Sequence, residues 1–203
     1  MSVASARLLC IFVTPLLLAA CSLLPEPEPA ALDKYLLEYT PEQASTPRAD
    51  APVLMISRPQ AHGAYDTPRI AYMQQQYGLR YYTRSQWADT PARMLAPLIA
   101  EAFSASGQFQ ALYTSAGRVS AGLRLDTELL RFHQDFTRRP SEMQVSMRAQ
   151  LVDLDTQRVL GTQLFEISEA APSEDAYGGV QAANRAVARL LEELVAFCTG
   201  QAG

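Results

Sequence analysis

Four consecutive residues near the N-terminus, Leu18-Ala19-Ala20-Cys21, have the types and spacing that covalent chemistry needs. Two small side chains give a peptidase access to the backbone, and the thiol that follows can carry a lipid. Before them come a positive charge at Arg7 and an apolar run, Leu8–Leu17, which Thr14 and Pro15 interrupt. This order is typical of a secretory signal, because the run is too short and too broken for a stable membrane span.

The segment resembles the bacterial lipobox, in which the cysteine receives a diacylglycerol thioether, becomes the new amino terminus and is acylated again. The resemblance implies a signal peptide over residues 1–20 and lipidation at Cys21, which would anchor the mature chain to a membrane. A cleaved signal with a chance cysteine and an apolar N-terminal anchor stay open as alternatives. Ser22, in place of an aspartate, favours the periplasmic face of the outer membrane by resemblance to lipoproteins of the enteric type.

Residues 22–31 alternate proline with glutamate, in the order Ser-Leu-Leu-Pro-Glu-Pro-Glu-Pro-Ala-Ala. Proline fixes its backbone and lacks an N–H group, so this segment suits neither a helix nor the interior of a sheet. We expect the lipidated cysteine and a stiff spacer over residues 21–32, with a reach of about 30 Å at roughly 3.1 Å per residue. One folded domain would follow over residues 33–203.

The rest of the chain offers little for catalysis or metal binding. His62 and His133 are the two histidines, and neither has a second ligand at metal spacing. We expect His133 to be exposed or hydrogen-bonded, and we interpret Gly178-Gly179 as a flexible entry to a helix. The sequence has no Gly-x-Ser-x-Gly elbow and no phosphate-binding glycine motif. A serine triad built from distant residues stays open, but the sequence favours a protein that is not an enzyme and uses no cofactor or metal.

The net charge and the number of cysteines exclude two further classes, nucleic-acid-binding proteins and disulfide-stabilised domains. The chain has a net charge of −4, and loss of Arg7 with the signal makes it more negative, so there is no electrostatic case for binding nucleic acid. Cys10 would leave with the signal and Cys21 would carry lipid. Cys198 then has no disulfide partner, and we expect it to be a buried, inert thiol.

Hydrophobic periodicity predicts the elements. Strict alternation over Leu123–Leu129 and Val145–Leu151 indicates antiparallel strands with one wet face. Apolar residues at helical spacing predict a helix from Pro91 to its stop at Gly107, and a terminal amphipathic helix over Gln181–Cys198. Further strands are expected over residues 33–40, 52–57, 69–73, 79–83, 109–113 and 159–167. The fold class is α+β: a single domain with a mainly antiparallel sheet and two main amphipathic helices packed on it.

A dense group of aromatic side chains interleaves with Arg69, Arg80 and Arg84. Tyrosine, tryptophan and arginine are preferred at the energetic centres of protein interfaces. The alternative is that the tyrosines of a hairpin pack across its strands, and both interpretations can hold on opposite faces. The aromatic residues are Tyr65, Tyr72, Tyr77, Tyr81, Tyr82 and Trp87.

Three stretches of this region are similar to a known family: Pro52-Val-Leu-Met-Ile-Ser, Ala64-Tyr-Asp-Thr-Pro-Arg-Ile-Ala-Tyr and Leu79-Arg-Tyr-Tyr-Thr-Arg-Ser-Gln-Trp-Ala-Asp-Thr-Pro. They resemble the ABC-type transport auxiliary lipoproteins, which are outer-membrane lipoproteins that accompany MCE-type, paraquat-inducible-type lipid transport systems. The early Tyr35-Leu-Leu strand and the final alanine-rich helix fall in the expected order. Trp87 and its neighbours are the most specific part of the match.

The resemblance implies a non-enzymatic role beside a periplasmic MCE-domain protein, which an inner-membrane permease and ATPase serve. Together they would move phospholipid or another hydrophobic substrate between membranes, and a symmetric MCE ring would favour a homo-oligomeric ring of this chain. Two alternatives stay open: a lipoprotein that itself binds an apolar ligand, and one that supports envelope assembly. The residues expected to dock the partner are Tyr65, Tyr72, Tyr81, Tyr82, Arg84 and Trp87.

Overall fold

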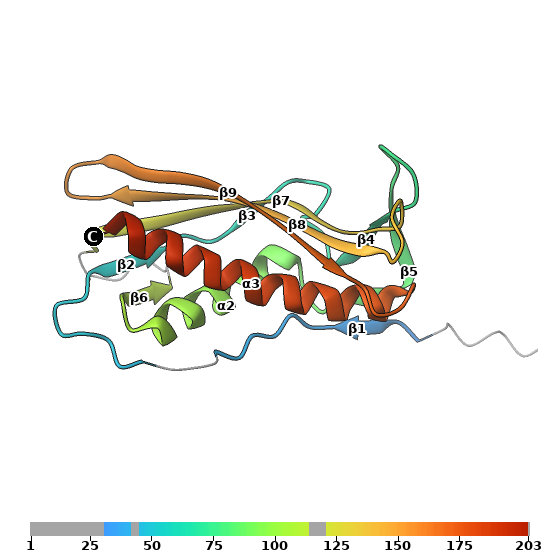
Figure 1. Ribbon diagram of the computed structural model, residues 1–203, viewed down its shortest axis with the longest axis horizontal. Coiled ribbons are helices and arrows are strands. Elements are labelled where there is room, and N and C mark those ends of the chain that lie inside the picture. The colour runs from blue at the N-terminus through green and yellow to red at the C-terminus, as the bar shows by residue number, and fades with distance from the viewer. Residues whose placement is uncertain (1–30, 42–44, 114–120, 203) are drawn as a thin grey trace, which may run out of the picture. The chain divides into compact units, whose positions relative to one another are not determined.

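Strand β7 (Leu123–Asp135) organises the sheet, because other strands pair with it along both edges (Figure 1). The computed structural model describes residues 31–41, 45–113 and 121–202. On one edge β7 pairs antiparallel with β8 (Glu142–Asp153), and β8 pairs antiparallel with β9 (Arg158–Ala170). Buried and partly exposed residues alternate along most of β7, so the predicted meander with one wet face is confirmed.

Three short strands share the opposite edge of β7. β2 (Val53–Ile56) pairs with its start, β3 (Gln60–Ala61) with its middle and β4 (Arg69–Met73) with its end, all in parallel. β6 (Gln110–Tyr113) lies parallel to β2 on the far side. Over the described residues the sheet has nine strands and is mixed, and its longest ladders are the antiparallel ones.

A hairpin carries the sheet beyond β4. β5 (Leu79–Trp87) pairs antiparallel with β4, and β1 (Asp33–Tyr35) pairs in parallel with Ser85–Trp87 at the end of β5. β1 is shorter than the strand over residues 33–40 that the sequence predicts.

In the described part of the chain, helices α2 and α3 cover one face of the sheet (Figure 1). α2 (Pro91–Ser106) begins with a proline at its first position and ends at Gly107, whose φ of 66° lies in the left-handed region that glycine tolerates. Pro97 lies inside α2, and the helix continues through it. α3 (Ala176–Ala202) packs against β8 and β9, and it begins before the predicted Gln181. No helix in the described part of the chain is long and apolar enough to cross a membrane.

The segment after β1 lies against α3 and not against a strand. The side-chain amide of Asn184 in α3 accepts a hydrogen bond from the backbone N–H of Glu38 at 2.7 Å and donates one to the carbonyl oxygen of Leu36 at 3.3 Å. These contacts take the place of a strand partner, which is the physical reason that β1 ends at Tyr35.

The hydrophobic core lies between the helices and the inner face of the sheet. Leu125 and Met147 of the sheet and Leu190 and Leu194 of α3 are all fully buried. Burial of a side chain of this size contributes about 1.5–3 kcal/mol. The predicted class is confirmed: Leu32–Gly203 is one compact unit with a mainly antiparallel sheet and two amphipathic helices.

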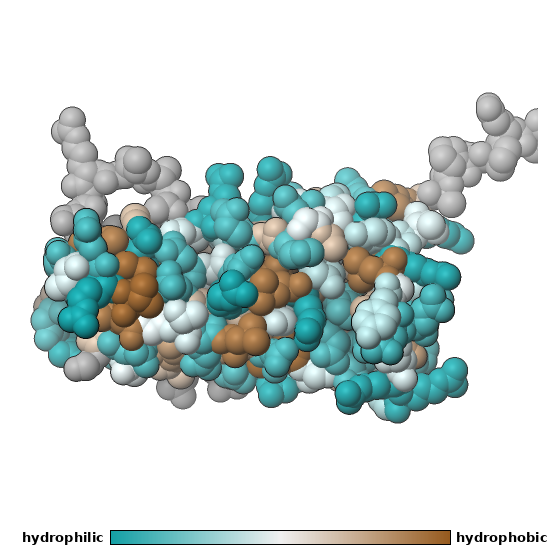
Figure 2. Space-filling view, turned by 90° about the horizontal axis from the view of Figure 1, so that it is seen from above, coloured by the Kyte–Doolittle hydropathy of each residue, from teal (hydrophilic) through white to brown (hydrophobic). Residues whose placement is uncertain are grey.

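The other face of the sheet is polar. Glu128 pairs with Arg148 across β7 and β8 at 3.0 Å, and Arg131 pairs with Glu166 of β9 at 3.1 Å. Figure 2 shows this uncovered face, where hydrophilic residues surround separate apolar patches. Exposed ion pairs of this kind contribute about 0–1 kcal/mol each, so they add little to the stability of the fold.

Candidate partner-binding surface

The aromatic residues around the β4–β5 hairpin divide into two clusters. In the first, the Tyr65 hydroxyl lies 2.9 Å from His133 Nδ1, and the Tyr81 hydroxyl donates to the carbonyl oxygen of Ala64 at 2.9 Å. In the second, the rings of Tyr72 and Tyr82 have centroids 4.7 Å apart. The structure thus brings the predicted tyrosines into one region but holds them by two separate sets of contacts.

Two residues of the expected docking set lie in the core. Trp87 is 1% exposed and packs on Phe132 with ring centroids 5.5 Å apart. Tyr65 is 9% exposed. Neither side chain presents enough area for a partner to contact, so their assignment to the docking surface is corrected: they pack inside the domain, against Phe132 and His133 of β7.

His133 is buried beneath Tyr65. Its Nδ1 atom is hydrogen-bonded to the Tyr65 hydroxyl, and the two rings are stacked with an interplanar angle of 13°. Burial lowers the pKa of His133 and raises the pKa of Tyr65, because both charged forms would lose hydration. Of the two states expected for this histidine, the structure shows the hydrogen-bonded one.

A row of hydrogen-bonded polar side chains connects the hairpin through β7 to Ser141, the residue before β8. The Tyr82 hydroxyl donates to Gln134 Oε1 at 2.9 Å, and Gln134 Nε2 donates to Ser141 Oγ at 2.9 Å. Gln134 and Ser141 are both fully buried. Burial is the main cause that raises the pKa of Tyr82. The sequence analysis did not predict these hydrogen bonds, because nothing in the local sequence of Gln134 and Ser141 indicates that they are buried.

Gly178 and Gly179 lie inside α3, and they are not a flexible entry to it. A Cβ atom at Gly179 would collide with Gln134 Oε1, and one at Gly178 would collide with the backbone oxygen of Ser173. The glycine pair therefore permits close approach between the helix, the sheet and the preceding turn. The adjacent glycines were the available sequence signal, and close packing is what they signal here.

The hairpin also presents a set of arginines. Arg69 Cζ lies 4.0 Å from the centre of the Tyr81 ring, which is a cation–π contact, and Arg80 and Arg84 are exposed. Within the described residues, none of the three forms an ion pair. Tyr77, at the turn between the strands, is 90% exposed. This leaves an accessible surface of half-buried tyrosines flanked by unpaired positive charge.

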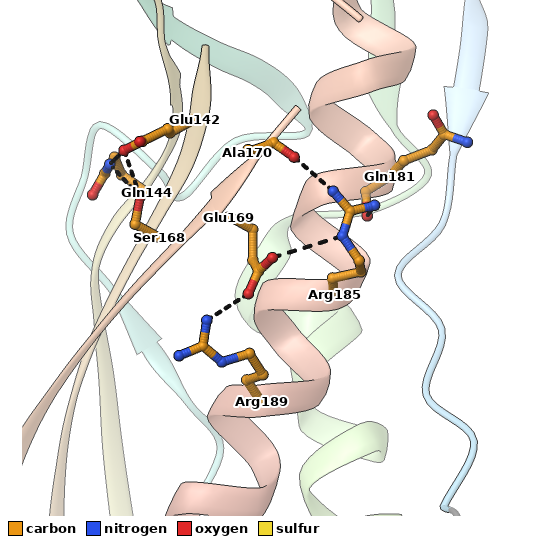
Figure 3. Close-up of polar contacts among 8 residues, drawn as sticks. All are labelled: Glu142, Gln144, Ser168, Glu169, Ala170, Gln181, Arg185 and Arg189. Atoms are coloured by element: carbon orange, nitrogen blue, oxygen red, sulfur yellow. Dashed lines mark hydrogen bonds and ion pairs between the residues drawn. The ribbon is translucent and has the colours of Figure 1, made fainter. Parts of the chain in front are cut away.

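A second cluster of polar side chains joins α3 to β9, and it stabilises the fold. Figure 3 shows Glu169 between two arginines of α3: it accepts from Arg189 at 2.5 Å and pairs with Arg185 at 3.7 Å. Arg185 also donates to the carbonyl oxygen of Ala170 at 2.6 Å. Glu142, drawn in the same figure, accepts from Ser168 across the neighbouring strands at 2.6 Å.

The other residues that the sequence singled out for chemistry are the cysteines and the possible metal ligands. Cys198 is fully buried, as expected, and burial raises the pKa of its thiol to about 12, so it is a poor nucleophile. In the described part of the chain, no three His, Cys, Asp or Glu side chains gather where they could hold a metal ion. The lipidation residue predicted from sequence, Cys21, lies outside the described residues, as does most of the spacer.

Comparison with known proteins identifies both a family and a fold. A family model described as the ABC-type transport auxiliary lipoprotein component matches residues 35–195. The crystal structure of protein XCC0632 from Xanthomonas campestris has a TM-score of 0.71 at 22% identity, covering 83% of this chain and 96% of that one. A hypothetical protein of Chlamydia trachomatis, CT253, has a TM-score of 0.53 at 10% identity, covering 74% and 98%. No curated protein matches the sequence.

Proposed function

The chain belongs to the family of ABC-type transport auxiliary lipoprotein components, and on this premise we propose that it is the non-enzymatic, lipid-anchored auxiliary subunit of an ABC/MCE-type system that moves lipid between membranes. The family match carries the proposal, because it covers residues 35–195 and so includes both the sheet and most of α3. In this role the energy comes from an ATPase in another subunit. The auxiliary subunit supplies a binding surface at a fixed place in the envelope.

We place the anchor at Cys21, after a signal peptide over residues 1–20. The order Leu-Ala-Ala-Cys supports lipidation, and Ser22 supports the periplasmic face of the outer membrane. The domain over residues 33–203 would then work at the end of the Pro/Glu spacer over residues 21–32. A thioether-linked diacylglycerol with a further acyl chain gives firm retention, since two or more chains bind far better than one.

We place the contact with a periplasmic MCE-domain protein on the accessible part of the hairpin. Tyr72, Tyr81, Tyr82 and Arg84 form it, and Trp87 supports it from the core. This composition matches the aromatic and arginine residues that dominate binding energy at protein interfaces.

Co-purification tests the proposal. The lipidated chain is extracted in mild detergent with the MCE-domain protein of the same organism, and we expect the two to elute together. Tyr81→Ala with Arg84→Ala should reduce recovery of the partner at least about tenfold, as loss of central interface residues does.

The matched control is Arg158→Ala with Val159→Ala, at the far end of β9, where Val159 is 54% exposed. We expect this pair to leave recovery unchanged. Arg84→Ala alone serves as a second variant that leaves Tyr81 packing intact. Failure of the unaltered chain to retain any MCE-domain protein would contradict the proposed function.

A further inference from the structure

The outer edge of β5 is open over most of its length. β1 pairs only with Ser85–Trp87, so residues 79–84 have no strand beside them on that edge among the described parts of the chain. Exposed strand edges present unpaired N–H and C=O groups, and these bind other extended chains readily. The open stretch is long enough for a strand of ordinary length to pair with it.

The open edge lies in a segment without acidic residues. No Asp or Glu occurs between Asp66 and Asp89, although the chain as a whole has a net charge of −4. Arg80 and Arg84 are exposed on β5, and within the described residues no carboxylate pairs with them. Arg80 donates a hydrogen bond to a neutral group, Gln74 Oε1, at 3.5 Å. The open stretch of β5 therefore carries positive charge of its own, while Asp33 of β1 lies opposite Ser85 at its end and Glu174 and Asp175 lie near Tyr82.

A shallow hollow accompanies the edge. Its lining includes Arg69, Tyr81, Tyr82, Thr83 and Leu32, and Leu32 is 46% exposed. Side chains from both faces of β5 thus border the same hollow, which suits an extended chain that places alternate side chains on each face.

We propose that the MCE-domain partner docks by adding an acidic, extended segment to the edge of β5 at residues 79–84. Main-chain hydrogen bonds would give affinity, and carboxylates of the segment would pair with Arg80 and Arg84. The inference rests on the proposed function and names the chemistry of its partner. Charge complementarity favours such a segment over strand β9 of a second copy as the occupant, because residues 159–165 of β9 carry no charge.

Charge reversal tests the electrostatic half of the proposal. Arg80→Glu with Arg84→Glu should weaken binding of the purified MCE-domain protein to the lipidated full chain at least about tenfold at low salt. The loss should shrink as salt screens the charges. Arg58→Glu with Arg158→Glu changes the net charge equally, away from the hairpin, and should leave binding close to that of the unaltered chain.

Amide hydrogen exchange tests the strand pairing. On addition of the MCE-domain protein, amides of residues 79–84 should exchange at least about tenfold more slowly, while those of residues 159–165 in β9 stay unchanged. A complex that forms without this protection would overturn strand addition and leave the proposed function standing. Absence of any complex would contradict the proposed function and this inference together.

Two other occupants give distinct outcomes. If this chain's own spacer covers the edge, residues 79–84 are protected before the partner is added and lose protection when residues 23–30 are replaced by glycine and serine. If a second copy covers it, protection rises with the concentration of this chain alone. Either result would overturn the proposal.

Discussion

His133 makes the stability of the fold depend on pH. Burial lowers its pKa in the folded state, while Asp135 opposes the shift and Arg131 adds to it. In the unfolded chain this side chain is protonated below its ordinary pKa of 6.5, whereas in the folded chain it is protonated only at a lower pH. Stability is full above that value and is lost as the pH falls through it.

Equilibrium unfolding between pH 7.5 and 5.5 tests this, since most carboxylates titrate lower. We expect the free energy of unfolding to decrease as the pH is lowered. One group can contribute no more than about 1.4 kcal/mol per pH unit to this decrease. His133→Gln, which keeps a polar partner for Tyr65, should flatten the dependence. An equal slope in the unaltered protein and in His133→Gln would contradict the assignment.

Gly179 is the residue at which one methyl group should disturb the fold. A Cβ atom there meets Gln134 Oε1, which is itself held by Tyr82, so Gly179→Ala should lower the free energy of unfolding by about 1–3 kcal/mol. Gly200→Ala is the control in the same helix: nothing lies within 4 Å of its Cβ position, and helix propensity favours alanine. Thermal unfolding that ranks Gly179→Ala equal to Gly200→Ala would refute the close contact.

At the scale of elements, the sequence predicted what depends on local periodicity. Leu123 to Leu129 alternate because only one face of β7 is covered, and the stripe of α3 repeats at helical spacing because only one side meets the sheet. The parallel pairing of β2, β3 and β4 with β7 could not be predicted, since strand order depends on contacts between residues far apart in the chain.

Two errors at element boundaries have the same cause. The strand after Asp33 was predicted too long because Asn184, far along the sequence, takes the hydrogen bonds of Leu36 and Glu38. The start of α3 was predicted too late because adjacent glycines usually weaken a helix, whereas here Gln134 and Ser173 lie where larger side chains would be.

The candidate surface was predicted in part for a related reason. The density of Tyr, Trp and Arg between residues 65 and 87 is visible in the sequence, and the hairpin it predicts is present. Which rings are buried depends on Phe132 and His133 of β7, which the hairpin meets only after folding. Composition therefore located the region, and tertiary packing decided that Trp87 and Tyr65 belong to its interior.

At the scale of the whole molecule, the two faces of the sheet differ in polarity. α2 and α3 cover one face with apolar side chains. The other face is exposed to water and carries ion pairs between neighbouring strands, and charged side chains of this kind disfavour aggregation. In the hairpin, arginines without a paired carboxylate among the described residues lie beside an open strand edge.

The length of the spacer should therefore matter to function and not to folding. Deleting residues 25–29 shortens the proposed tether by about 15 Å at roughly 3.1 Å per residue. We expect the same melting temperature and the same membrane retention, because neither the domain nor Cys21 changes, but less lipid transport and less MCE-domain protein recovered from cells. Replacing the same five positions with glycine and serine keeps the contour length and should restore most of both. Equal transport by the shortened and unaltered chains would show that the hairpin reaches its partner without the spacer.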